Sequence, residues 1–238
     1  MSIVAVPPVL AGSPREARQY KYFDKLVSAF VAVLLVSNLV APKMIAFGPF
    51  LFSGAQLLFP VTYIFGDVFT EVYGYAYSRR AIWSGFFAAA LLATLSAIVI
   101  ALPPAPEWHD QAAYITVLGM APRVFAASLI AYWAGEFANS YVMAKMKILT
   151  RGRYLWTRTV GSTAAGQAVD TVIVMIIVFA GRASWSDIIK LIYSGYLAKV
   201  LYEVAATPLT YLVVNFLKRR EGVDPLDVNT DFNPFVTR

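Results

Sequence analysis

Five acidic residues lie inside segments that are apolar enough to cross a membrane, and only one lysine lies among them. The six residues are Asp67, Glu71, Glu136, Asp170, Glu203 and Lys199. A charged group at the centre of a bilayer costs roughly 2.5–3.5 kcal/mol on insertion scales, so such residues usually mark a functional polar site inside a helical bundle. We therefore expect the chemistry of this chain to take place at these carboxylates.

Other polar residues accompany the acids at helical spacing, which places them on the same helix faces. The stripes are Tyr63, Asp67 and Glu71; Glu136, Asn139 and Ser140; Thr163, Gln167 and Asp170; Lys199 and Glu203; and Ser37 with Asn38. Two interpretations of Lys199 and Glu203 stay open: an ion pair within one helical turn, or part of a site. Glu71 lies close enough to the end of its segment to pair with Arg79 or Arg80.

The composition is that of a membrane protein. The 238 residues are 59% hydrophobic, with a mean hydropathy of +0.62, and 14% are charged, whereas soluble domains have about 25%. Without cysteines, and with His109 as the only histidine, disulfides, thiolate metal sites and histidine metal clusters are excluded, and we expect no cofactor and no metal. The net charge of +6 fits basic cytoplasmic loops better than nucleic-acid binding.

Hydropathy predicts an all-α polytopic membrane protein with one six-helix domain over residues 21–220. A flexible N-terminal extension (residues 1–20) precedes it, and a polar tail (residues 221–238), extended or weakly ordered, follows it. The predicted spans are Phe23–Pro42, Leu57–Ser78, Ala81–Leu102, Pro122–Lys147, Leu155–Gly181 and Asp187–Leu217. Segment Lys43–Gln56 is expected to form a hairpin or re-entrant turn on the outer side, and Pro103–Ala121 an outer loop with a short interfacial helix.

The basic residues predict the orientation. Fifteen of the twenty Lys and Arg residues fall on one side of the six spans and four on the other, which places both termini in the cytoplasm. The midpoints of four spans fall beside Asp67, Glu136, Asp170 and Glu203, so four helices bring acids to about the same depth. Transporters usually bind their cargo at such a depth.

A planar heterocycle suits this set of groups, because a carboxylate accepts hydrogen bonds from adjacent ring N–H and amino groups while aromatic side chains stack on the ring. A small organic cation would also fit, and an anion would not. No nucleotide-binding motif is present. The chain is therefore expected to be a facilitator, a proton-coupled transporter or the membrane subunit of a larger assembly. An intramembrane enzyme is a weaker alternative, because no Ser–His pair and no protease motif occurs.

An ordered set of short strings points to a family. They are Ser37-Asn38, Phe59-Pro60, Asp67, Glu71-Val72-Tyr73-Gly74, Gly135-Glu136-Phe137-Ala138-Asn139-Ser140, Lys145, Arg158, Ser162-Thr163, Gly166-Gln167, Asp170, Lys199, Tyr202-Glu203, Pro208 and Phe232-Asn233-Pro234-Phe235. Over nearly the whole chain this set resembles the queuosine precursor transporter family, also called the vitamin uptake transporter family.

The resemblance implies a bacterial inner-membrane protein that imports a 7-deazaguanine for tRNA queuosine salvage, with a fold similar to the substrate-binding subunits of energy-coupling-factor transporters. The substrate-binding residues that it implies are Asn38, Asp67, Glu71, Glu136, Asn139, Gln167, Asp170, Lys199 and Glu203. Of these, Asp170, Gln167, Glu136 or Asn139 are expected to recognise the purine-like edge, and Lys199 with Glu203 to orient or gate the site. The expected partners are the lipid bilayer and a deazapurine; a homodimer stays open, and no nucleic acid is expected.

Overall fold

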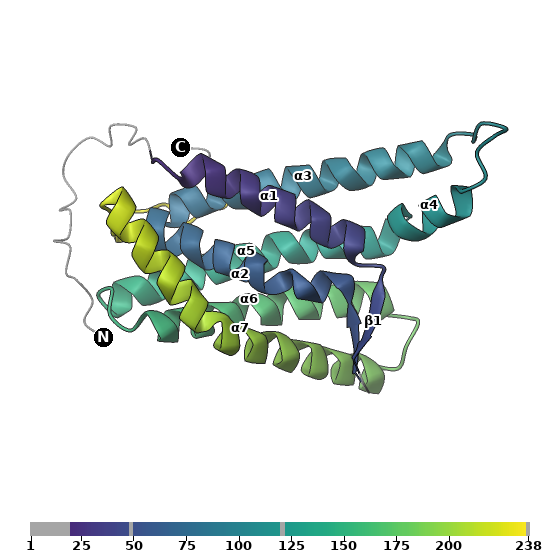
Figure 1. The fold of residues 1–238 in the computed structure, drawn as a ribbon. Coiled ribbons are helices and arrows are strands. Elements are labelled where there is room, and N and C mark those ends of the chain that lie inside the picture. Colours follow the sequence, from purple (N-terminus) through teal and green to yellow (C-terminus); the bar gives the residue numbers. More distant parts are fainter. Residues whose placement is uncertain (1–19, 48–49, 120–121, 237–238) are drawn as a thin grey trace.

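The computed structural model describes residues 20–47, 50–119 and 122–236, and these form an all-α polytopic membrane protein. The helices are α1 (Phe23–Val40), α2 (Phe59–Val68), the π-helical segment η2 (Phe69–Tyr73), α3 (Tyr75–Ala101), α4 (Gln111–Leu118), α5 (Pro122–Leu149), α6 (Leu155–Phe179) and α7 (Trp185–Glu221). A two-stranded antiparallel hairpin, β1 (Met44–Phe47) and β2 (Phe50–Ser53), and the 3₁₀ turn η1 (Gly54–Leu57) join α1 to α2. The long helices lie side by side in one bundle (Figure 1).

Two ends of this bundle differ, and both are used as landmarks below. The hairpin end carries β1, β2 and α4, and the last turns of α3 extend there beyond the other helices (Figure 1). The tail end is where α1 begins, α7 ends and residues 222–236 lie. The expected hairpin after α1 and the expected short helix between the third and fourth spans are both present.

Five helical stretches in the described part of the chain are long and apolar enough to cross a membrane. They are α1, α3, the combined stretch of α4 and α5, α6, and α7. The second predicted span, Leu57–Ser78, is shorter than expected. Its helix covers α2 and η2, which are ten and five residues long, and it ends at Gly74. About 20 residues are needed to cross a bilayer, so this helix crosses only part of the apolar layer by itself.

Gly74 reverses the chain between α2–η2 and α3. Its φ of 82° is accessible to glycine at little cost, and a Cβ atom there would come within 3.2 Å of Asp227 Oδ1. The predicted spans placed Arg79 and Arg80 in the connection between the second and third helices. They belong instead to the first turns of α3, which begins at Tyr75. The reversal thus depends on both a glycine and the packing of the tail.

Three buried hydroxyl groups join the elements around this reversal. Thr70 Oγ1 lies 3.0 Å from Ser78 Oγ and 3.1 Å from Ser140 Oγ, and the two serine oxygens are 2.8 Å apart. Hydroxyl groups that bond one another in this way link helices where no water is available. The contact fixes η2, α3 and α5 relative to one another.

Residues 223–236 of the tail form coil and turns, and they pack against the bundle through specific contacts. Asp227 is buried and accepts a 3.0 Å hydrogen bond from the backbone N–H of Tyr75. Arg79 donates to two tail carbonyls at 2.8 and 3.0 Å, and Trp83 Nε1 donates to Pro234 O at 2.8 Å. The predicted N-terminal extension lies outside the described residues, except for Tyr20.

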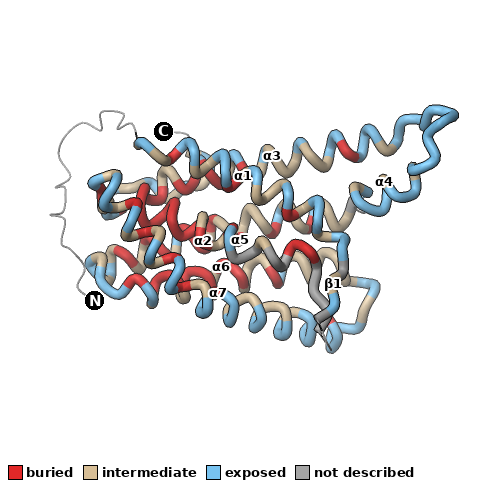
Figure 2. The backbone as a smooth tube through the Cα atoms, in the orientation of Figure 1, coloured by how far each residue is buried: buried red, intermediate tan, exposed pale blue. Residues whose placement is uncertain are grey.

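Burial divides the bundle into an interior centred on α2 and an apolar outer surface. Figure 2 shows that the buried positions gather around α2 and toward the tail end, whereas the outer parts of α3, α4 and α7 are exposed. An aromatic cluster of Phe23, Phe30, Phe69 and Tyr73 packs α1 onto α2 and η2. The exposed surface of α3 is apolar, with Leu91, Leu95 and Ile98 among its residues, as expected of a surface that faces lipid.

Candidate functional site

Helices α5 and α6 approach each other closely because glycines lie at their contact. A Cβ atom on Gly135 would come within 2.9 Å of the Asp170 Cβ, and one on Gly166 would come within 2.8 Å of both Gly135 O and the Asn139 Cβ. Small residues allow this approach between membrane helices. The consequence is that the polar stripe of α5 and the polar stripe of α6 lie next to each other.

A cavity of about 350 Å³ lies beside this contact. Its polar lining comes from most of the long helices: Ser37, Asn38, Thr62, Tyr63, Ser96, Ser128, Tyr132, Glu136, Asn139, Thr163, Gln167, Asp170 and Lys199. Ala41, Pro42, Ala55 and Val117 line it as well, so it extends toward the hairpin end. The volume falls in the range of small-molecule pockets, which are mostly apolar with a few polar groups that fix the ligand.

The sequence-predicted residues divide into two groups around this cavity. Asn38, Glu136, Asn139, Gln167, Asp170 and Lys199 line it, whereas Asp67, Glu71 and Glu203 do not. Tyr63, which extends the Asp67 stripe in the sequence but was not among the expected substrate-binding residues, also lines the cavity. Its spacing of four residues from Asp67 was the signal that it belonged to the site.

Lys199 pairs with an acid on another helix. Its Nζ atom lies 2.6 Å from Asp170 Oδ2 and 3.3 Å from Thr171 Oγ1, and both charged side chains are about one quarter exposed. The interpretation of Lys199 and Glu203 as an ion pair within one turn of α7 is therefore wrong. The same spacing along the helix allows either arrangement, and the orientation of α7 against α6 selects Asp170.

Glu136 is the cavity carboxylate without a partner. Within the described part of the chain it makes no hydrogen bond and no ion pair, and its Oε2 atom would lie 3.1 Å from a Cβ on Gly66 of α2. Two neighbouring amide oxygens, Asn139 Oδ1 and Gln167 Oε1, are buried and likewise have no hydrogen-bond donor among the described residues. The cavity wall thus offers several acceptors that a ligand with N–H groups can use.

Asp67 and Glu203 lie deeper than the cavity wall. Both are completely buried, and none of their four carboxylate oxygens makes a hydrogen bond with normal geometry to the described residues. The charged groups around Asp67 include the carboxylates of Glu203, Glu136 and Glu71. A carboxylate that is buried without a partner is costly, so this pair is an unusual feature of the bundle.

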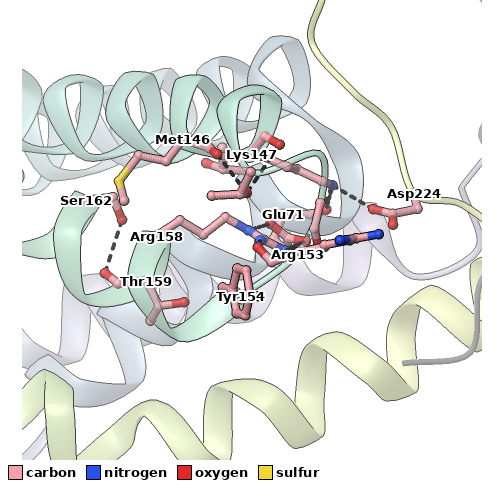
Figure 3. Close-up of polar contacts among 12 residues, drawn as sticks. Glu71, Met146, Lys147, Arg153, Tyr154, Arg158, Thr159, Ser162 and Asp224 are labelled. Carbon is pink, nitrogen blue, oxygen red and sulfur yellow. Dashed lines mark hydrogen bonds and ion pairs between the residues drawn. The ribbon is translucent and has the colours of Figure 1, made fainter. Parts of the chain in front are cut away.

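Glu71, by contrast, is the centre of an ion cluster near the tail end (Figure 3). Arg158 Nε and Nη2 each lie 2.7 Å from a carboxylate oxygen of Glu71, in a bidentate arrangement, and Lys218 contacts the same carboxylate. Lys147 donates to the Glu71 carbonyl at 2.7 Å, and Asp224 of the tail lies 2.7 Å from Lys147 and 2.8 Å from Lys218.

The ion cluster also involves the turn between α5 and α6 and the tail. Arg158 Nη1 donates to Arg153 O at 2.5 Å in this turn, where Tyr154 adopts a left-handed conformation with φ 54°. Burial alone would raise the pKa of Asp224, but the ammonium groups of Lys147 and Lys218 outweigh burial and hold that pKa below its usual range. The expected pairing of Glu71 with Arg79 or Arg80 is wrong, because Arg79 binds the tail and Arg80 lies over aromatic rings.

Three layers therefore follow one another along α2 and η2 from the cavity toward the tail end. Tyr63, Asp67 and Glu71 are spaced by four residues, which corresponds to about 6 Å per layer. The first layer lines the cavity, the second is the unpartnered acid pair with Glu203, and the third is the ion cluster. The cavity is thus separated from the tail end by two layers of buried charge.

Comparison with known proteins identifies the type of molecule that carries these layers. The sequence model of the putative vitamin uptake transporter family matches residues 53–213, about two thirds of the chain. The chain belongs to this family. The matched region of this family member contains every sequence-predicted site residue except Asn38.

A curated relative agrees with this assignment. The probable queuosine precursor transporter of Bacillus subtilis (strain 168) is 28% identical over 206 residues, which cover 85% of this chain and 90% of the relative. No solved structure matched the chain. As a member of the vitamin uptake transporter family, the chain is a multi-pass membrane transporter and not an enzyme.

Proposed function

We propose that this transporter imports a queuosine precursor, 7-cyano-7-deazaguanine or 7-aminomethyl-7-deazaguanine, without an ATPase of its own. The name of the Bacillus subtilis relative supports this class of cargo. The cavity supports it independently, because its volume of about 350 Å³ suits a single small heterocycle. The observation that carries the proposal is Glu136, an unpaired carboxylate on the wall of this cavity.

A guanine-like edge presents a ring N–H next to an exocyclic amino group, and a carboxylate accepts from both donors at once. Glu136 has both oxygens available for this arrangement. Asn139 Oδ1 and Gln167 Oε1 are further acceptors nearby without a donor of their own in the described chain. A heterocycle with several N–H donors would satisfy groups that are costly to leave without partners.

The remaining polar lining suits the other parts of the ring. Lys199, which is held by Asp170 at 2.6 Å, can donate to a carbonyl oxygen of the cargo. Tyr63 and Tyr132 lie on the cavity wall and offer surfaces on which a planar ring can stack. An anionic cargo is disfavoured, because Glu136 and Asp170 outnumber the one lysine of the lining.

We further propose that the tail end faces the cytoplasm and that the protein resides in the bacterial inner membrane. The Lys and Arg residues are concentrated at the tail end, as expected of cytoplasmic segments. In this orientation the cavity extends toward the outside, and the two layers of buried charge close it from the cytoplasm. The arrangement is that of a transporter ready to receive cargo from outside.

Binding to the purified protein and uptake into proteoliposomes together test the proposal. Labelled 7-cyano-7-deazaguanine and its aminomethyl relative are expected to enter vesicles that contain only this protein. Glu136→Gln removes one strong acceptor and adds a donor, and a charged hydrogen bond contributes about 1.5–3 kcal/mol. We therefore expect binding to weaken by roughly 10- to 100-fold.

Glu107→Gln is the matched control, because Glu107 is exposed in the loop before α4. It should bind and transport like the natural protein. Equal binding by Glu136→Gln would remove Glu136 from the site, and tighter competition by another planar heterocycle would assign a different cargo. Uptake that requires an added ATPase module would contradict transport by this chain alone, and mass analysis should find the cargo unaltered.

A further inference from the structure

The layer between the cavity and the ion cluster contains more hydrogen-bond acceptors than donors. Four carboxylate oxygens of this layer have no donor among the described residues: Asp67 Oδ1 and Oδ2, and Glu203 Oε1 and Oε2. The adjoining cavity wall adds two more buried acceptors, Asn139 Oδ1 and Gln167 Oε1. Each buried acceptor without a donor costs roughly 1–3 kcal/mol. Something that supplies positive charge or donors to these oxygens would therefore be strongly held.

The neighbouring cations are engaged elsewhere. Lys199 lies 2.6 Å from Asp170, and Arg158 and Lys218 both bind Glu71. Carboxylates on three elements lie around Asp67: Glu203 on α7, Glu136 on α5 and Glu71 on η2. Around Glu203 the charged residue one turn away is Lys199, whose ammonium group pairs with α6. No cation of the described chain neutralises this pair.

A proton resolves the shortage in a way that a metal ion does not. A protonated carboxyl group loses its charge and gains one O–H donor, which a neighbouring oxygen can accept. Glu203, which lies near Asp67, supplies such acceptors, because its Oε1 and Oε2 atoms have no donor among the described residues. The described residues contain no group of three or more acidic or histidine side chains that could hold a metal ion.

We propose that Asp67 and Glu203 form a proton-binding site whose occupancy drives cargo uptake. This inference rests on the proposed transport function and adds its energy source. A proton enters from water in the cavity, binds one carboxylate oxygen of the pair, and leaves to water at the tail end when that end opens. Tyr63 lies between the two sites, because it lines the cavity and stands one turn of α2 before Asp67.

The position of the pair makes this coupling reasonable. A charged pair in this buried layer resists the movement of α2 past α7, whereas a protonated pair can be repacked with little electrostatic cost. The layer lies about 6 Å, one turn of α2, from the cavity residue Tyr63 and the same distance from Glu71. Protonation can therefore respond to cargo on one side and to the ion cluster on the other.

Proteoliposomes with a controlled pH gradient test the proposal, with potassium and valinomycin holding the membrane potential at zero. One proton per neutral cargo predicts about tenfold accumulation for each unit of pH gradient. The ratio of uptake with the gradient to uptake without it should fall to one in Asp67→Asn and Glu203→Gln. It should stay at the natural value in the controls Asp187→Asn and Glu107→Gln, whose side chains are exposed. Wild-type accumulation that ignores the pH gradient, or that follows a sodium gradient instead, would overturn the proposal.

A measurement on the purified protein keeps the test decisive if a variant does not transport. Infrared spectroscopy detects the carbonyl stretch of protonated carboxyl groups. This band should weaken in Asp67→Asn and in Glu203→Gln but not in Asp187→Asn. An unchanged band in both site variants refutes the proton site even when transport is lost. Failure of the proposed function would give a different result. The protein would neither bind nor exchange either deazaguanine, while the infrared band would still weaken in the two site variants.

Discussion

Replacing Glu71 by glutamine should destabilise the protein more than replacing its principal partner, Arg158, by the same residue. The ion cluster contains two carboxylates and three cations, so its net charge is +1. Glu71→Gln raises this net charge to +2 and leaves Arg158, which is 1% exposed, without any carboxylate partner. Breaking a buried pair in this way costs about 3–5 kcal/mol.

Arg158→Gln has a smaller expected effect because Glu71 keeps two cations. Lys218 contacts its carboxylate, and Lys147 lies 3.4 Å from Oε1. The lost contribution is that of hydrogen bonds to a charged group, about 1.5–3 kcal/mol. The expected order of destabilisation is therefore Glu71→Gln, then Arg158→Gln, and the difference is about 1–2 kcal/mol on these estimates.

Equilibrium unfolding in mixed micelles, with sodium dodecyl sulfate as the denaturant, measures these free energies. Asp187→Asn serves as the control, because its 3.6 Å ion pair with Lys190 joins side chains that are 60% and 75% exposed. Such a pair contributes about 1 kcal/mol or less. The reasoning is refuted if Arg158→Gln proves the more destabilising variant, or if Glu71→Gln costs no more than the control.

Three further predictions concern the helix contact, the tail and pH. Gly135→Val should weaken deazaguanine binding at least tenfold and lower the melting temperature, because its Cβ would approach Asp170 to 2.9 Å; unchanged binding would contradict the close contact. Arg79→Ala removes two hydrogen bonds to tail carbonyls and should speed protease cleavage within residues 222–236 by about tenfold, whereas equal cleavage rates would mean that the tail is held by other contacts. Lys147 and Lys218 lower the pKa of Asp224 in the folded protein. Asp224 therefore stabilises the protein at pH values above its unfolded pKa of about 3.9. This stabilisation is lost as the pH falls from the unfolded pKa through the lower pKa of the folded state. The difference in unfolding free energy between Asp224→Asn and the natural protein should then be constant from neutral pH to about pH 5 and disappear in stronger acid; a difference that grows in acid would refute the sign.

Much of the fold could be predicted from hydropathy and from Gly and Pro positions. The long apolar runs are the long helices, and the short segment broken by Pro42, Gly48 and Gly54 contains the hairpin. The end of the second span could not be predicted. The residues after Gly74 continue the helical pattern, and the reversal depends on Asp227, which lies some 150 residues farther along the chain and bonds the first amide of α3.

Helix midpoints predicted that four acids lie at about the same depth, but not their separation into layers. Glu136 and Asp170 line the cavity, while Asp67 and Glu203 lie beyond its wall. An uncertainty of two to four residues in each span end shifts a midpoint by about 3–6 Å, which is the thickness of a layer.

Ion-pair partners were also beyond the reach of sequence spacing. The spacing of four residues from Lys199 to Glu203 permits a pair, yet Lys199 binds Asp170 on a neighbouring helix. Which partner Lys199 binds depends on how each helix is rotated about its own axis. The membrane helices are apolar on several faces, so the sequence pattern does not determine this rotation.

The docked tail makes completion of the protein a late event in its synthesis. Residues 222–236 follow every helix of the bundle, so all spans can enter the membrane before Asp224 and Asp227 exist. A chain interrupted before residue 224 leaves Lys147, which is 1% exposed in the finished structure, without its 2.7 Å counter-ion, and leaves the Tyr75 amide without an acceptor. Unfinished chains therefore differ from finished ones by unsatisfied charged and polar groups at the tail end of the bundle, which lowers the stability of that end.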